Sequence, residues 1–197
     1  MAVKGGETYY RTMIRHDTES WNVRDRHMVS VLRKLMEFHG ESAKAIVWEH
    51  NTHIGDARAT DMADDGMVNV GQLLREAHGT QDVYAIGFGT YEGTVIAGRS
   101  WGAPLEIMQV PPAISNSWEE LLHRISPENK LLFFRENAEV LDETIVGHRA
   151  IGVVYHPERE RGNYVPTVIS KRYDAFIYLD QTKALSPLAV EPVLTTR

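Results

Sequence analysis

Two histidines, two carboxylates and an arginine lie within ten residues of one another, at the end of a short apolar run. The apolar run covers residues 43–49. The ionisable residues are Glu49, His50, His53, Asp56 and Arg58. Such a run, containing β-branched residues, is typical of a buried parallel strand. Because open α/β sheets bind ligands beyond the carboxyl ends of their strands, this stretch is the first candidate for a functional site.

The spacing leaves three interpretations of the histidines open. They can hydrogen-bond the backbone and hold the shape of a loop. A His-x-x-His pair with a carboxylate can instead bind zinc or another divalent ion, although the zincin spacing His-Glu-x-x-His is absent. A neutral imidazole whose tautomer is fixed by a carboxylate can also take a proton from water, while an arginine such as Arg58 binds a substrate carboxylate or stabilises an oxyanion.

The composition excludes several other classes of function. The 197 residues include no cysteine, which excludes disulfides, a thiolate nucleophile and a cysteine-based zinc site. A Gly-x-Ser-x-Gly elbow is absent too. The net charge of -6 argues against nucleic-acid binding, and no apolar run approaches the ~20 residues that span a membrane. With no apolar signal-peptide region near Met1, we expect a reducing, cytoplasmic location.

Hydrophobic periodicity predicts the elements that position the histidines. Helices are expected over residues 7–16, 21–39, 70–77 and 118–124. The last begins with Ser117 and Glu120 in a capping-box pattern. Loops are expected over residues 50–67 and 157–162.

The expected strands are short and alternate with the helices. They cover residues 43–49, 82–89, 94–98, 105–110, 150–155 and 173–179, whereas 130–134 fits a strand or a helix. We interpret Gly87-Phe88-Gly89 as close strand packing rather than as a nucleotide loop, because the third glycine is missing. The alternation predicts one α/β domain over residues 1–197 with a mainly parallel sheet, and an antiparallel excursion within residues 90–110.

Five segments, in order, resemble motifs of the erythromycin esterase-like family. Residues 48–58 resemble its W-x-H-N-x-H segment and residues 24–28 its R-D-x-x-M helix. Residues 87–93, 149–155 and 173–180 resemble its G-F-x-x-x-x-G, R-x-I-G-x-x-Y and Y-D-A strands. The likeness runs from residue 20 to residue 188 and is closest to the branch sometimes fused to a phosphoribosyltransferase domain.

The resemblance implies a three-layer α/β/α fold with a helical insertion. It also implies metal-independent hydrolysis of an ester, such as a macrolactone, by histidine-activated water, with no cofactor. Carried over, the candidate catalytic residues are His50, His53 and Glu49. The candidate substrate-binding residues are Arg24, Asp25, Asn51, Asp56 and Arg58. Since Glu49 stands where many relatives carry a small residue, we expect it either to raise the pKa of His50 or to make the pocket favour cations.

The chain departs from the family in length. The family's catalytic His and Glu lie in an N-terminal half that has no counterpart here, and the helix over residues 7–16 lacks a start cap. We therefore expect the C-terminal part of an esterase-like domain, whose partners are a small ester substrate and the missing N-terminal half. An uncovered sheet edge and apolar face predict self-association. The alternative hypothesis is a non-catalytic ligand-binding or partner module.

Overall fold

The computed structural model describes residues 18–135, 141 and 143–187, so the helix predicted over residues 7–16 lies outside the described residues. The helices are α2 (Thr18–His39), α3 (Asn51–Ile54), α4 (Val70–His78), α5 (Trp118–Ile125) and α6 (Ile169–Arg172), with 3-10 turns η1 (Ala57–Ala59), η2 (Asp61–Ala63) and η3 (Pro157–Asn163). The strands are β1 (Ile86–Ala97), β2 (Glu106–Val110), β3 (Lys130–Phe133), β4 (Val146–Arg149), β5 (Tyr164–Thr167) and β6 (Ala175–Thr182). None of the described helices is long and apolar enough to cross a membrane.

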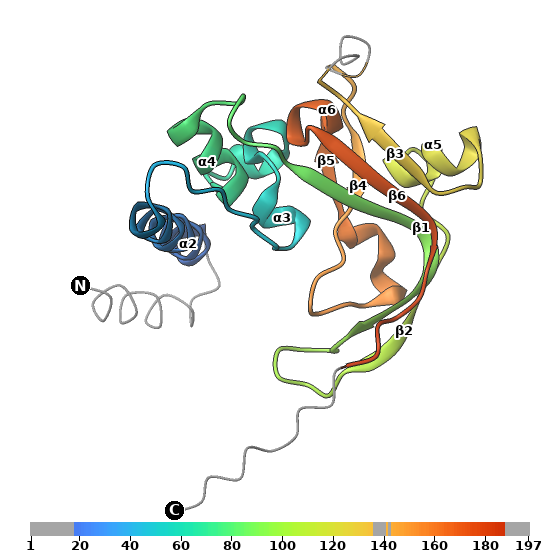
Figure 1. Cartoon of the computed structure of the whole chain (residues 1–197). Coiled ribbons are helices and arrows are strands. Elements are labelled where there is room, and N and C mark those ends of the chain that lie inside the picture. The colour runs from blue at the N-terminus through green and yellow to red at the C-terminus, as the bar shows by residue number, and fades with distance from the viewer. Residues whose placement is uncertain (1–17, 136–140, 142, 188–197) are drawn as a thin grey trace, which may run out of the picture.

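The predicted α/β fold class is confirmed. A four-stranded sheet has the order β2-β1-β6-β3, in which β1 and β6 are parallel while β2 and β3 are antiparallel to their neighbours. Strands β4 and β5 form a separate antiparallel pair. In Figure 1, α2, α3 and α4 lie together on one side of β1, whereas α5 lies beside β3 on the other. The sheet is therefore mixed, and the helices gather at its two flanks.

One face of the four-stranded sheet is covered. Phe176 and Tyr178 of β6 are fully buried on this face, in a core that α5 helps to form. Their register partners on β1 are Gly87 and Gly89. A Cβ added at Gly87 would lie 2.7 Å from the ring of Tyr173, and one added at Gly89 would lie 2.6 Å from the ring of Phe176. The close strand packing predicted for this segment is therefore confirmed.

The opposite face of the sheet is apolar, and the described residues leave most of it uncovered. Side chains alternate along a strand, so Phe88, Ile177 and Leu131, which are register partners across three strands, share this face. Ile86 and Phe133 lie on the same face, two residues further along their strands. Leu131 and Phe133 are 55% and 58% exposed. In Figure 1, β4 and β5 lie behind β1 and β6, and no described helix lies in front of them.

Local signals predicted three helices correctly. Helix α2 ends at Gly40, whose φ is 92°, and α4 ends at Gly79, whose φ is 83°. The capping box of α5 is formed, because Ser117 Oγ accepts the backbone N–H of Glu120 at 3.2 Å. These boundaries depend on residues close in sequence, which explains why they were predictable.

The central strand predicted over residues 43–49 is wrong. These residues form no strand, and Ile46 and Trp48 are 95% and 84% exposed. A strand needs a neighbour for its backbone hydrogen bonds. Trp48 does reach β1, since its ring centroid lies 5.9 Å from that of Phe88. However, the backbone of Phe88 is already bound by the side chain of Asn51. The run has the composition of a strand without a described strand to pair with.

Other strand boundaries also differ from the prediction. The two strands predicted over residues 82–89 and 94–98 form one strand, β1, which changes partner near Gly93. The strand predicted over residues 150–155 falls earlier, as β4, because the antiparallel partner β5 pairs only with Val146–Arg149. The predicted loop over residues 50–67 contains α3, η1 and η2, and residues 157–162 lie in η3. The antiparallel excursion is confirmed by β2.

Candidate active site

The carboxylate of Asp25 joins three helices at one point. Asp25 is the fully buried residue of α2. Its Oδ1 and Oδ2 lie 2.9 and 3.0 Å from Nδ1 of His53, on α3. Its Oδ2 also accepts the backbone N–H of Val70 at the start of α4, at 3.2 Å. A helix N-terminus favours a negatively charged group, so the start of α4 suits a carboxylate, and Asp25 fixes His53 between α2 and α4.

The imidazole of His53 is oriented as a general base would be. A carboxylate only accepts hydrogen bonds, so Nδ1 carries the proton and Nε2 holds the lone pair of the neutral ring. Nε2 lies 3.3 Å from Nη2 of Arg24. Trp21 stacks on the ring, with centroids 4.5 Å apart and planes 7° apart, and Arg24 lies over Trp21. The His53 side chain is 18% exposed, which lets water approach it.

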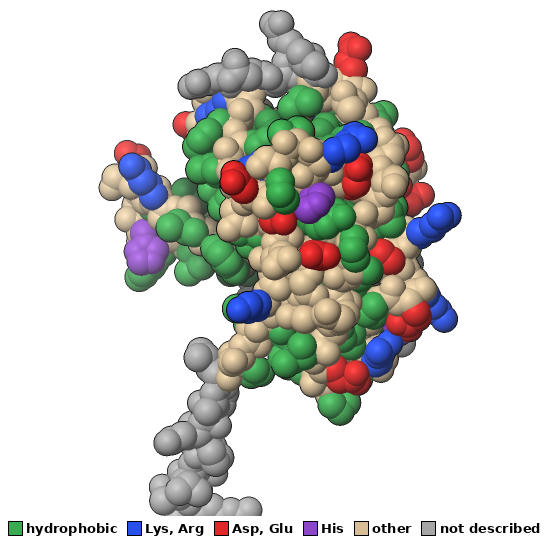
Figure 2. Space-filling view, turned by 90° about the vertical axis from the view of Figure 1, so that its right-hand side faces the viewer, with side chains coloured by type: hydrophobic (Ala, Val, Ile, Leu, Met, Phe, Trp, Pro, Cys, Tyr) green, Lys and Arg blue, Asp and Glu red, His purple; other side chains and the backbone are tan. Residues whose placement is uncertain are grey.

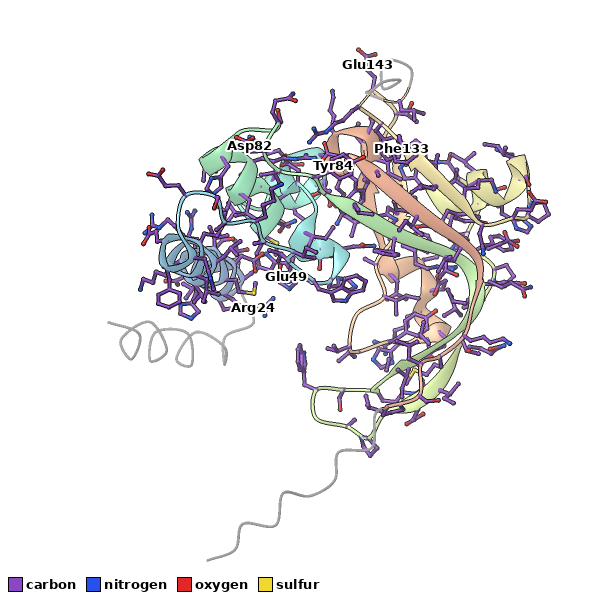
Figure 3. The ribbon with its side chains drawn as sticks, in the orientation of Figure 1. Arg24, Glu49, Asp82, Tyr84, Phe133 and Glu143 are labelled. Atoms are coloured by element: carbon purple, nitrogen blue, oxygen red, sulfur yellow. The ribbon has the colours of Figure 1, made fainter. Side chains whose placement is uncertain are left out.

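Glu49 brings a second carboxyl group to the same junction. Figure 3 shows Arg24 on α2 and Glu49, just ahead of α3, facing the space where the two segments meet. Burial raises the pKa of Glu49, while the charges of His53 and Arg24 oppose the rise and that of Asp25 adds to it. Its Oε2 is buried and has no hydrogen-bond partner among the described residues. A carboxyl group with a raised pKa is suited to donating a proton to a leaving group.

His50 is placed differently from His53. Its Nδ1 accepts the backbone N–H of Thr52 at 3.2 Å and so caps α3. Its Nε2 donates to the carbonyl oxygen of Ile151 at 2.5 Å. Burial lowers the pKa of His50, so the expected rise caused by Glu49 is wrong. Both ring nitrogens are engaged in holding the turn, whereas a role of His50 in proton transfer stays a prediction.

Asp56 and Arg58 lie in an ion-pair network beside this junction. Arg58 Nη2 is 2.7 Å and Arg75 Nη1 is 3.3 Å from Asp56 Oδ2, and Arg75 Nη2 is 2.9 Å from Asp174 Oδ2. Burial alone would raise the pKa of Asp56, but the hydrogen bonds and charge of Arg58 hold it below its usual value. The network joins α4 to the residue before β6. A role of Asp56 and Arg58 in substrate binding stays a prediction.

Sequence reasoning missed three residues that shape the site: Trp21, Glu119 and His148. Trp21 stands one helical turn before Arg24, a spacing that is visible in the sequence. His148 Nδ1 lies 2.6 Å from Glu119 Oε1, and its Nε2 lies 3.4 Å from Nδ2 of Asn51. Glu119 and His148 are 29 residues apart, and no local pattern marks them as partners. The described residues hold no group of three or more His, Cys, Asp or Glu arranged to bind a metal ion.

The fold and the junction define a class of mixed α/β proteins in which a histidine–carboxylate pair is held between helices. The sequence profile of the erythromycin esterase family matches residues 1–182, and the chain belongs to that family. This confirms the resemblance seen in the sequence.

Solved structures of the same fold are longer than this chain. A succinoglycan biosynthesis protein matches 83% of the chain with a TM-score of 0.67 and 21% identity. A protein from Bacillus cereus matches 84% with a TM-score of 0.65 and 22% identity. The erythromycin esterase EreC, solved as a histidine mutant in its open conformation, matches 88% with a TM-score of 0.55 and 20% identity. The chain spans 39%, 40% and 41% of these structures, respectively.

Proposed function

We propose that this chain forms part of a hydrolase site that cleaves esters, macrolactones among them, with His53 as the base that activates water. The observation that carries the proposal is the His53–Asp25 pair, in which Asp25 holds Nδ1 of His53 and Nε2 lies 3.3 Å from Nη2 of Arg24. Membership of the erythromycin esterase family supports the reaction class. No metal or other cofactor has a step in this scheme.

Each step follows from the position of one side chain. A water molecule on Nε2 of His53 loses a proton to the ring as its oxygen attacks the ester carbonyl, and Asp25 stabilises the resulting imidazolium. Arg24 stabilises the oxyanion that forms on the carbonyl oxygen. The C–O bond to the leaving alcohol then breaks, and that oxygen takes a proton from the His53 imidazolium, or from Glu49, which the imidazolium then reprotonates. An acid and an alcohol are released.

Hydrolysis of model esters by the purified chain tests this function. Asp25→Asn keeps the size of the side chain but removes the charge that stabilises the imidazolium. We expect a loss of turnover of about 10²–10⁴-fold, the usual contribution of a positioned acid–base group. Asp180→Asn is the matched control, because Asp180 holds another histidine, His123, at 2.7 Å. Equal turnover by wild type and Asp25→Asn would rule out the proposed role.

A second candidate function is a module that works by association, with or without turnover. It is supported by the uncovered sheet face that carries Phe88, Leu131 and Phe133. Figure 3 shows Tyr84 and Phe133 close together at one end of this face, and Tyr84 is 50% exposed. An apolar face of this kind favours contact with another protein surface. We propose that the chain self-associates through it, and that the rest of an esterase-type fold covers it when supplied.

Light scattering tests the proposed association. We expect the wild-type chain to form dimers or larger species, and Phe133→Glu to shift the distribution towards monomer. Ile125→Glu is the control, because Ile125 is 76% exposed on α5, outside the apolar sheet face. Figure 2 views the molecule from the right-hand side of Figure 1, and apolar and charged side chains are interspersed on that surface. A wild-type chain that is monomeric at all concentrations contradicts self-association.

A further inference from the structure

The side-chain amide of Asn51 takes the place of a neighbouring strand at the edge of β1. Its Nδ2 donates to the carbonyl oxygen of Phe88 at 2.5 Å, and its Oδ1 accepts the N–H of Phe88 at 3.1 Å. On its other side, Phe88 is the register partner of Ile177 in β6. We call this pair of hydrogen bonds the Asn51 clamp. A reversed amide would face donor to donor and acceptor to acceptor, so the clamp forms in one orientation only.

A buried histidine favours the same orientation. His148 is fully buried, and its Nδ1 lies 2.6 Å from Oε1 of Glu119. Because the carboxylate only accepts, Nδ1 carries the proton and Nε2 holds a lone pair. That lone pair faces Nδ2 of Asn51 at 3.4 Å. Burial lowers the pKa of His148 against the opposing effect of Glu119, which keeps the ring neutral. Only the NH₂ end of the amide can face a lone pair.

Glu119 is itself held in place by its surroundings. It is fully buried in the first turn of α5, and its Oε1 also accepts the backbone N–H of Arg149 at 3.1 Å. The fully buried guanidinium of Arg172 lies near His148 and near Tyr173, 5.4 Å from the centre of the Tyr173 ring. A buried positive charge balances a buried carboxylate. A chain of contacts that begins in α5 thus reinforces the amide orientation that the Phe88 backbone requires.

We propose that Glu119 and His148 are positioning residues for His53. They reinforce the orientation of the Asn51 amide, and the Asn51 clamp then holds α3, which carries His53. This helix is a single turn of four residues, too short to be stable without tertiary contacts. The structural part stands on the geometry alone, whereas its consequence for hydrolysis rests on the proposed function.

The first test reads the tautomer and the clamp directly by NMR. Long-range proton–nitrogen correlation should show the proton of His148 on Nδ1 and Nε2 unprotonated. Asn51→Asp places an oxygen against the carbonyl of Phe88 and against the His148 lone pair. We expect hydrogen exchange of the Phe88 backbone N–H to become at least tenfold faster in this variant. This rate change corresponds to a protection free energy lower by about 1.4 kcal/mol.

A matched control makes the same substitution elsewhere. Oδ1 of Asn129 accepts the N–H of Asp180 at 3.0 Å, which a carboxylate oxygen also does. Asn129→Asp should therefore leave the exchange of the Phe88 N–H unchanged. A proton found on Nε2 of His148, or equal Phe88 exchange in wild type and Asn51→Asp, overturns the proposal.

The second test separates positioning from the chemistry. His148→Phe keeps a ring but removes the Nε2 acceptor, whereas Glu119→Gln keeps an acceptor oxygen for Nδ1. We expect His148→Phe to weaken the hydrogen-bonded Nδ1 proton signal of His53 and to lower kcat at least tenfold with little change in KM. Glu119→Gln should retain most of the His53 Nδ1 proton signal and most of the wild-type kcat. If His148→Phe does not fold, the His53 Nδ1 proton signal and kcat are measured in Asn51→Asp instead.

The possible outcomes distinguish the two claims. An unchanged His53 signal with unchanged kcat in His148→Phe overturns the positioning role. If the His53 signal changes as expected while even the wild-type chain hydrolyses no ester, the positioning role stands and the proposed function fails.

Discussion

His53–Asp25 and His148–Glu119 are the same chemical pair in two environments. In both, a carboxylate oxygen holds Nδ1, at 2.9 Å in the first and 2.6 Å in the second. The His148–Glu119 side chains are both fully buried, whereas the His53 side chain is 18% exposed. Nε2 of His148 faces a protein amide, and Nε2 of His53 faces a guanidinium at the open edge of a helix junction.

The comparison indicates that the two histidine–carboxylate pairs differ in solvent access rather than in their chemical groups. A histidine whose second nitrogen is engaged inside the protein organises its neighbours. A histidine whose second nitrogen faces a partly exposed arginine can exchange a proton with solvent. The two pairs are linked, because Asn51 contacts His148 while His53 lies on the same turn. We therefore expect substitutions in the buried His148–Glu119 pair to change the free energy of unfolding most, and substitutions in the His53–Asp25 pair to change turnover most.

Removing the buried imidazole should have the largest effect on folding. His148→Ala leaves the buried Glu119 carboxylate with the Arg149 N–H but without its imidazole partner, and it opens a cavity beside Phe176. We expect a loss of about 3–5 kcal/mol in the free energy of unfolding, the usual cost of breaking a buried charged contact. Urea denaturation measures it. His53→Ala serves as the comparison and should cost less than half as much, so equal losses would contradict the assigned difference between the pairs.

The ionisation of Glu49 should produce a smaller effect that depends on pH. Burial raises its folded-state pKa above the ordinary value, so its contribution to stability is fully present at acid pH and is lost as the pH rises through the folded pKa. Glu49→Gln carries no charge at either pH and so avoids this loss of stability. We expect its free energy of unfolding at neutral pH to exceed that of wild type by at most about 1 kcal/mol, because the group is partly exposed. Thermal unfolding of both proteins at acid and neutral pH checks this. A variant that is less stable at both pH values contradicts the assigned burial cost.

Replacing Trp21 should also change the free energy of unfolding by a small amount, without the pH dependence expected for Glu49. It stacks on His53 and donates from Nε1 to the carbonyl oxygen of Val68 at 3.0 Å. Trp21→Phe keeps an aromatic face and loses the hydrogen bond, so we expect a loss of about 0.5–1.5 kcal/mol. Trp101→Phe is the control, since Trp101 is 71% exposed, and it should change the unfolding free energy little. Similar changes in the free energy of unfolding for both variants would contradict a role of Trp21 in holding the site together.

The sequence contained enough to predict part of this arrangement. Helix ends at Gly40, Gly79 and Ser117 depend on nearby residues and were predictable. The family motifs brought His53 and Asp25 together as neighbours. The failures involve distant partners: residues 43–49 have the composition of a strand, but pairing depends on a neighbouring edge that the local sequence does not specify. Glu119 and His148 were missed for the same reason.

The most direct test of the central claim compares His53→Asn with His123→Asn. Both histidines bind an aspartate through Nδ1, at 2.9 Å to Asp25 and 2.7 Å to Asp180, but only His53 shares its junction with Arg24 and Glu49. Ester hydrolysis by the purified proteins is the measurement. The expected result is a loss of about 10²-fold or more in kcat for His53→Asn and near wild-type kcat for His123→Asn. Equal kcat values for the two variants would contradict the assignment of His53 as the base.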